Sequence, residues 1–173
     1  MQNKEHSLCF TGHRGEKLPK TETEMEQLRN SLLREIDKAM ENGIDTFYMG
    51  ACYGFDLLAA EMVLLRKKLI PLKKANRKRI KLIAVVPHEG QANAWDEQDR
   101  ERYFDYTLPF CDDVITLHSQ FQPGCYHERN RYMVDRCSQM IAYYDGSKGG
   151  TAYTIKYAQS KKLNIINLYE QKI

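Results

Sequence analysis

The chain has 173 residues, of which 42% are hydrophobic and 28% charged, and its 26 basic and 23 acidic residues give a net charge of +3. This length fits one domain, and the mild charge argues against nucleic-acid binding through a broad basic surface. The five cysteines lack CxxC spacing, which argues against a disulfide scaffold and a zinc site, and no apolar run reaches the length of a membrane span. We expect a cytoplasmic protein with reduced thiols, no metal and no membrane partner.

Apolar segments and helical patterns alternate along the whole chain. The apolar segments predict strands at 7–11, 46–50, 80–86, 113–118, 140–145 and 164–169. Most are continuous apolar runs, which are typical of strands buried on both faces of a parallel sheet. The patterns between them predict helices from the capping box at Thr21 to just before Gly43, and at 55–69, 91–108, 127–138 and 150–162. The basic run at 66–81 is interpreted as a solvated helix end and loop, with a phosphate-binding patch as the alternative.

This alternation implies right-handed βαβ crossovers in a single α/β domain. The predicted fold is Rossmann-like and doubly wound, with a mostly parallel sheet of about six strands and helices on both faces. In such sheets, ligands bind at the carboxyl ends of the strands, near the point where the strand order reverses. The candidate site residues are therefore those that directly follow each strand.

The segment after the first predicted strand contains Gly12, His13 and Arg14. Gly12 allows a sharp turn, Arg14 is able to hold a phosphate by two hydrogen bonds, and His13 is able to donate a hydrogen bond or titrate near neutral pH. We favour a binding site over the alternative, in which Arg14 pairs with a surface carboxylate and His13 merely caps the loop.

The turn after the second predicted strand is bracketed by Gly50 and Gly54 and enters a helix. The free backbone N–H groups of that helix point back toward the crevice and form an anion site. Asp56 either caps the helix or accepts a ribose hydroxyl, and capping needs no ligand to explain it.

Two further segments follow later strands. Trp95, after the third predicted strand, either stacks on a base or fills a half-buried core position. Arg129 and Asn130 fall in the first turn of a predicted helix. The helix dipole disfavours a cation there unless an anion is bound nearby, so this position favours an anionic ligand.

Three glycines follow the fifth predicted strand, at Gly146, Gly149 and Gly150, and Thr151 comes next. The glycines allow a ligand to approach the backbone, and the Thr151 hydroxyl adds a donor beside the positive end of a helix. The pattern predicts a phosphate cradle, with a merely structural turn as the alternative.

Four segments together carry a resemblance to a known family: TGHR at 11–14, GACYGFDLLAAE at 50–61, RNRYMVD at 129–135 and YDGSKGGTAYTIKYA at 144–158. They resemble the SLOG superfamily, and within it the YpsA-like branch of small single-domain proteins, from about Ser7 to Leu168. The resemblance implies a Rossmann-like fold that binds a nucleotide or an ADP-ribose-type ligand. It carries the ligand role to Gly12, His13, Arg14, Gly50, Gly54, Asp56, Arg129, Asn130, Gly149, Gly150 and Thr151.

One departure from related sequences bears on catalysis. LOG-type phosphoribohydrolases of this superfamily carry PGGxGTxxE, and aligning its Gly-Thr with Gly150 and Thr151 places Thr154 at the position of the catalytic glutamate. Cleavage of an N-glycosidic bond normally needs a carboxylate. The carboxylates able to substitute from another position are Asp56, Glu61, Glu128 and Asp145.

We therefore expect a ligand-sensing or regulatory protein whose partner is a phosphate-bearing small molecule, and no cofactor is firmly implied. The first alternative is an enzyme that cleaves nucleoside monophosphates, as LOG-type hydrolases do. The second is a single-stranded DNA binder similar to DprA, against which the near-neutral charge speaks. The 11 tyrosines would tolerate a homodimer interface.

Overall fold

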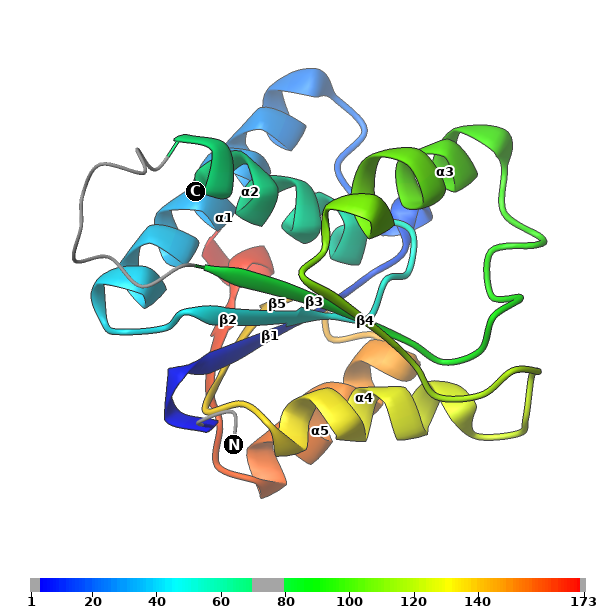
Figure 1. The fold of residues 1–173 in the computed structure, drawn as a ribbon. Helices are drawn as coiled ribbons and strands as arrows, with labels where there is room; N and C mark the ends of the chain where they lie inside the picture. The colour runs from blue at the N-terminus through cyan, green and yellow to red at the C-terminus, as the bar shows by residue number, and fades with distance from the viewer. Residues whose placement is uncertain (1–3, 70–79, 172–173) are drawn as a thin grey trace.

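The computed structural model describes residues 4–69 and 80–171. In these ranges six parallel strands form one sheet with the order β4-β3-β2-β1-β5-β6 (Figure 1). The strands are β1 (Ser7–Gly12), β2 (Thr46–Met49), β3 (Lys81–Val86), β4 (Asp113–Thr116), β5 (Gln139–Tyr143) and β6 (Asn164–Asn167). The Rossmann-like, doubly wound fold predicted from the sequence is confirmed.

The strand order reverses between β1 and β5. β1 pairs with β2 on one side and with β5 on the other, where the register runs from Leu8 opposite Gln139 to Gly12 opposite Tyr143. β3 and β4 continue the sheet beyond β2, and β6 lies beyond β5. The loops after β1 and β5 therefore leave the same edge of the sheet side by side, where folds of this kind bind ligands.

Successive side chains of the central strands enter different hydrophobic cores. Phe47 and Met49 of β2 pack in the core shared with α1 (Glu22–Glu41) and α2 (Phe55–Leu69). Tyr48, which lies between them, packs in a second core with α4 (Cys125–Asp135) and α5 (Gly150–Ser160). Because helices cover both faces of the sheet (Figure 1), the strands appear in the sequence as continuous apolar runs.

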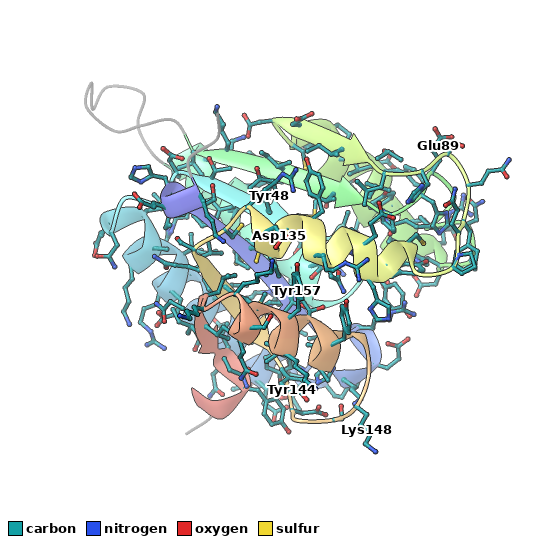
Figure 2. All side chains as sticks on the ribbon, turned by 90° about the horizontal axis from the view of Figure 1, so that it is seen from below. Tyr48, Glu89, Asp135, Tyr144, Lys148 and Tyr157 are labelled. Atoms are coloured by element: carbon teal, nitrogen blue, oxygen red, sulfur yellow. The ribbon has the colours of Figure 1, made fainter. Side chains whose placement is uncertain are left out.

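The helices α4 and α5 lie side by side on their face of the sheet (Figure 2). The Tyr157 hydroxyl of α5 donates to the Asp135 carboxylate of α4 at 3.0 Å, and Arg131 Nη1 of α4 donates to the Tyr153 hydroxyl at 2.9 Å. These pairs run in the same direction along both helices, so the two N-terminal ends reach the same edge of the sheet.

The helices predicted at 91–108 and 127–138 differ most from the structure. The segment 91–108 is not one helix: it contains turns, then α3 (Glu97–Glu101), a π-helix (Arg102–Thr107) and the start of a 3₁₀-helix (Leu108–Phe110). The Asp96 carboxylate accepts from the Asp99 N–H at 2.8 Å while its own backbone is extended, which starts a new helix there. The helix predicted at 127–138 begins two residues earlier and ends three residues earlier, as α4.

Most of the basic run at 66–81 lies outside the described residues. In its described part, Arg66 donates to Asp37 at 2.6 Å and Lys67 pairs with Asp112. These two contacts connect the end of α2 to α1 and to the residue before β4. Across the part of the chain that the structure describes, no helix has both the length and the apolar character needed to cross a membrane.

Candidate functional site

A cavity of about 400 Å³ lies where the strand order reverses, and four segments line it: residues 10–17, 52–56, 126–133 and 147–151. The sheet topology brings these segments together from the ends of β1, β2 and β5 and from the first turns of α4. Among the predicted site residues, those that line the cavity are Gly12, His13, Arg14, Asp56, Arg129, Asn130, Gly149, Gly150 and Thr151. The predicted residues that do not line it are Gly50, Gly54, Gly146 and Trp95.

The loop between β5 and α5 is open toward the cavity. Gly149 is the N-cap residue of α5 and has a φ of 148°, and Gly146 has a φ of 87°, so both adopt conformations that favour glycine. At Gly150 the backbone has no such requirement, and an added Cβ would meet nothing within 4 Å. No side chain caps the helix from the N-cap position, so the first turn presents its backbone N–H groups.

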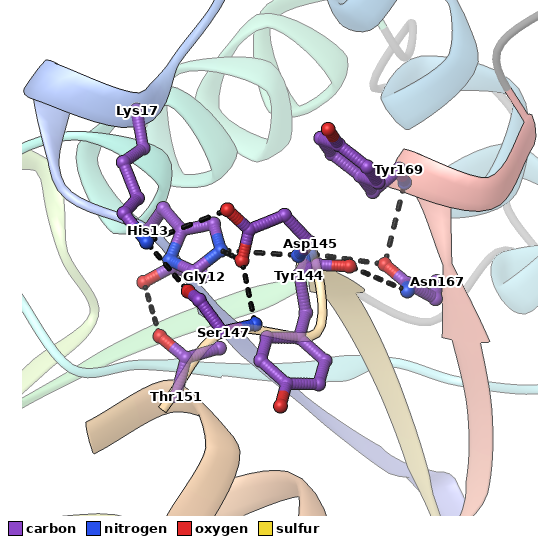
Figure 3. Close-up of polar contacts among 9 residues, drawn as sticks. All are labelled: Gly12, His13, Lys17, Tyr144, Asp145, Ser147, Thr151, Asn167 and Tyr169. Carbon is purple, nitrogen blue, oxygen red and sulfur yellow. Dashed lines mark hydrogen bonds and ion pairs between the residues drawn. The ribbon is translucent and has the colours of Figure 1, made fainter. Parts of the chain in front are cut away.

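The Thr151 hydroxyl connects this helix to the last residue of β1. It donates to the Gly12 carbonyl at 3.1 Å (Figure 3). A hydroxyl has a single proton, so in this arrangement the proton is used within the protein. The anion donors that α5 offers are therefore its backbone N–H groups rather than this side chain.

A cluster of polar side chains holds the β5–α5 loop against the turn after β1 (Figure 3). Nε2 of the buried His13 lies 2.7 Å from Asp145 Oδ1 and 3.0 Å from the Asp145 backbone nitrogen. Asp145 Oδ1 also accepts from the Ser147 N–H at 2.9 Å, and Lys17 Nζ contacts both Asp145 and Ser147. Hydrogen bonds from Ser147, and then from His13, lower the pKa of Asp145 well below its usual value.

A continuous chain of hydrogen bonds crosses the opposite wall of the cavity. Arg129 Nη1 donates to the Gly50 carbonyl, and its Nε donates to Asn130 Oδ1 at 2.7 Å. Asn130 Nδ2 donates to the Thr154 hydroxyl at 2.7 Å, which in turn donates to the Gly150 carbonyl at 2.9 Å. The chain links the end of β2 to the start of α5 through α4. In this chain the hydroxyl of Thr154, the residue that aligns with the LOG-type glutamate, both donates and accepts a hydrogen bond.

Gly50 and Gly54 shape the β2 side without lining the cavity. A Cβ at Gly50 would lie 2.7 Å from Asp56 Oδ2 and closer still to the Arg129 guanidinium. Gly54 has a φ of 93°, and a Cβ there would lie 2.6 Å from the backbone of Arg14. Glycine is therefore required at Gly54, where the crowding atoms are backbone, whereas at Gly50 they are the ends of the Arg129 and Asp56 side chains.

Asp56 is a buried carboxyl in the cavity wall. Its Oδ2 accepts from the Cys52 N–H at 3.4 Å. Cys52 lies ahead of α2, so this bond is not the helix cap given as one alternative from the sequence. Burial raises the pKa of Asp56 to about 6, although the charge of Arg129 opposes the rise. The side chain is thus placed to lose or gain a proton near neutral pH.

Trp95 packs against residues of the site without lining the cavity. Its ring packs edge-on against Tyr53 and Tyr103, with centroid distances of 5.3 and 5.2 Å, and it lies beside the larger core. Tyr53, which does line the cavity, carries Arg14 over its ring at 5.2 Å. The geometry therefore agrees with the core alternative for Trp95.

Several cavity residues were not singled out from the sequence: Lys17, Cys52, Tyr53, Tyr126, Ser147 and Lys148. All of them lie within the segments after the first, second and fifth strands or at the start of α4. Their position in these segments, together with the aromatic or basic character of most of them, was the signal in the sequence that could have identified them as site residues. Lys148 points away from the domain at the tip of the β5–α5 loop (Figure 2).

The other three carboxylates named from the sequence as substitutes for the LOG-type glutamate, Glu61, Glu128 and Asp145, do not line the cavity. Glu61 pairs with Arg102 at 2.8 Å, and Glu128 lies 2.7 Å from His118. Within residues 4–69 and 80–171, no three His, Cys, Asp or Glu side chains come together as metal ligands.

Fold and site together define a class, the Rossmann-like α/β domains with a ligand-sized cavity where the strand order reverses. The family model YpsA, described as the YspA SLOG family, matches residues 8–171. The chain belongs to this family, which confirms the resemblance seen in its sequence.

Known relatives agree with this assignment. The SPbeta prophage-derived protein YoqJ of Bacillus subtilis is 29% identical over 153 residues, which cover 80% of this chain and 84% of YoqJ. A UPF0398 protein of Bacillus thuringiensis (strain Al Hakam) is 26% identical over 147 residues, which cover 84% of this chain and 76% of that protein.

Solved structures share the fold at low sequence identity. The DNA processing protein DprA of Streptococcus pneumoniae has a TM-score of 0.58 at 18% identity, and the match covers 94% of this chain but 50% of DprA. The protein TM1055 has a TM-score of 0.56 at 12% identity, with 92% of this chain and 71% of TM1055 covered.

Proposed function

We propose that this protein binds a nucleotide, or a nucleotide-derived molecule such as ADP-ribose, in the cavity between β1 and β5, and that it acts as a ligand sensor or regulator. The observation that carries the proposal is the open space at Gly150. Neither its φ nor any atom within 4 Å requires glycine there. A phosphate held by the first turn of α5 would require it, because a Cβ would project into the space that the ligand needs.

The charge of the cavity favours a phosphate ligand. Leaving aside Lys148, whose side chain points away from the domain, the basic side chains that line it still outnumber the acidic ones: Arg14, Lys17 and Arg129 against Glu16 and Asp56. A phosphate monoester carries about −1.5 to −2 charges at pH 7, which complements this excess. The volume of about 400 Å³ lies within the range of about 300–1,000 Å³ typical of small-molecule sites.

A sensor is favoured over a hydrolase by the surroundings of Thr154. Its hydroxyl is bonded to Asn130 and Gly150, and the side chain is buried, so this position supplies no carboxylate to the ligand. Asp56 keeps the hydrolase as a second candidate, because a carboxyl with a pKa of about 6 in the cavity wall suits general acid–base catalysis. DNA binding is not proposed, since the resemblance to DprA is one of fold.

Calorimetric titration with AMP, NAD and ADP-ribose tests the proposal. We expect the wild type to bind at least one of them, and Gly150→Ala to bind it about tenfold or more weakly, because the added methyl meets the ligand. Gly15→Ala is the matched control: its Cβ would lie 3.9 Å from Tyr53 and outside the cavity lining. Thermal unfolding should show both variants folded. Equal binding by Gly150→Ala and the wild type would refute a phosphate at α5.

The same mixtures distinguish the sensor from the hydrolase. Chromatography after incubation should recover the ligand intact if the protein is a sensor. Released base or ribose phosphate would instead make it an enzyme, and its loss in Asp56→Asn would identify the carboxyl that acts in place of the glutamate.

A further inference from the structure

One face of α4 lines the cavity with residues of different chemistry. Tyr126, Arg129, Asn130 and Met133 have the spacing i, i+3, i+4 and i+7, which places them on a single helical face, and all four line the cavity. Tyr126 is nearest the start of the helix. Arg129 and Asn130 belong to the hydrogen-bond chain that reaches Gly150, whereas Tyr126 presents an aromatic ring farther out along α4.

Exposed aromatic surface extends from Tyr126. The ring of Phe121 lies 6.4 Å from that of Tyr126 and is 61% exposed, although large apolar side chains are ordinarily buried. His88 contacts both rings edge-on, at 5.6 Å from Phe121 and 5.9 Å from Tyr126. An aromatic shelf, formed by Tyr126, Phe121 and His88, thus runs from the cavity wall toward solvent.

The other tyrosine of the cavity is less available for stacking. The Arg14 guanidinium covers the ring of Tyr53 at 5.2 Å, Trp95 packs against it, and the Tyr53 hydroxyl donates to Glu16 at 3.0 Å. Arg129 lies 5.9 Å from the centre of Tyr126, at the limit of a cation–π contact, and its guanidinium is directed to Gly50 and Asn130. Tyr126 is therefore the better stacking surface.

The shelf and the phosphate cradle lie at the same ends of two parallel helices. Tyr126 precedes Asn130 by about one helical turn of α4. Asn130 is joined through Thr154 to Gly150, which precedes Thr154 by about one turn of α5. Tyr126 and Gly150 therefore both lie near the helix starts and line the same cavity, so a single ligand could contact both.

We propose that Tyr126 stacks on the aromatic base of the ligand, with Phe121 extending the contact. This inference rests on the proposed function and narrows it, because it makes the ligand a nucleotide with an aromatic base rather than a sugar phosphate or an inorganic anion. Stacking of this kind tolerates different bases, since every base has a π face. The shelf would therefore favour ligands that carry an aromatic base over ligands that lack one, without distinguishing one base from another.

Comparison of AMP with ribose 5-phosphate tests the inference by calorimetry. The wild type should bind AMP about tenfold more tightly than ribose 5-phosphate. Tyr126→Leu should weaken AMP binding to the level of ribose 5-phosphate and leave ribose 5-phosphate binding unchanged. Tyr126→Phe keeps the ring and should keep the preference. Phe121→Ala, at an exposed position, should reduce the preference without affecting folding.

Each failure has a distinct meaning. Equal wild-type binding of AMP and ribose 5-phosphate would overturn the stacking role while leaving the phosphate site in place. If neither compound bound, and ADP-ribose did not bind either, the proposed function itself would be refuted. If Tyr126→Leu weakened the binding of AMP and of ribose 5-phosphate equally, and Phe121→Ala left both affinities unchanged, Tyr126 would have only a structural role. The stacking inference would then be wrong.

Discussion

The two sides of the cavity use glycine for different reasons. On the β1–β2 side, a Cβ at Gly12 or Gly54 would come within 2.6 Å of other atoms of the protein. On the β5–α5 side, a Cβ at Gly149 or Gly150 would meet nothing within 4 Å. The first side is closed by protein packing, and the second is open to the cavity.

This difference separates two signals that look alike in the sequence. Gly50, Gly54 and Gly150 were all predicted from the sequence as ligand-site residues, but Gly50 and Gly54 are accounted for by their close approach to Asp56, Arg129 and Arg14. Gly150 has no comparable reason within the protein. A glycine that the protein does not need is the stronger indication of a ligand.

The largest expected effect is that of Gly54→Ala on the closed side. The new Cβ would clash with the backbone of Arg14 and would force a left-handed φ on alanine. We expect the free energy of unfolding in urea to fall by about 3 kcal/mol or more.

Gly15→Ala serves as the control for this experiment, because its Cβ would make an ordinary contact with Tyr53 at 3.9 Å. Its stability should stay within about 0.5 kcal/mol of the wild type. If Gly54→Ala were equally mild, the two sides of the cavity would not differ in packing.

A smaller effect is expected from Asp56→Asn, which tests the buried carboxyl of the closed side. The pKa of Asp56 is about 6 in the folded protein and 3.8 when unperturbed, so the folded state binds its proton more tightly. Stability from this proton is present below pH 3.8 and is lost as the pH rises to about 6. The difference between the two pKa values, which already includes the charge of Arg129, corresponds to at most about 3 kcal/mol of stability.

Urea unfolding across this pH window measures the effect. Relative to the wild type, Asp56→Asn should gain stability as the pH rises from about 4 to about 7. Asp105→Asn, which removes an exposed carboxylate, should leave the wild-type pH dependence unaltered. Parallel curves for wild type and Asp56→Asn would contradict a raised pKa.

The fold was predictable because its signals are local and repeated. Phe47, Tyr48 and Met49 form a continuous apolar run, and a strand covered by helices on both faces requires one. The prediction of one helix at 91–108 was wrong because the charged composition of this segment suits a helix throughout. The helix start at Asp96 and the later π-helical turns depend on contacts that a periodic pattern does not show.

The site was predictable at the level of segments and not of individual contacts. The carboxyl ends of parallel strands meet at one edge of the sheet, so Gly12 and Gly150 could be placed at that edge from the sequence. That they are neighbours follows from the pairing of β1 with β5, which the sequence did not predict. The partners of Arg129 could not be predicted, because its bonds to Gly50 and Asn130 depend on how α4 packs against the sheet. Long-range side-chain contacts leave no pattern in a single sequence.

The smallest expected effect is that of Gly149→Ala on the open side. Its φ of 148° disfavours alanine, but no atom within 4 Å opposes the methyl group, so the loop is free to relax. We expect about 1 kcal/mol of lost stability in urea unfolding, well below the loss in Gly54→Ala. AMP binding should nevertheless fall, because relaxation of the N-cap residue turns the N–H groups of α5 away from the cavity. A loss of stability as large as that of Gly54→Ala would mean that the β5–α5 loop is held as tightly as the β1–β2 side, and the open space at Gly150 would then belong to a rigid turn instead of a binding loop.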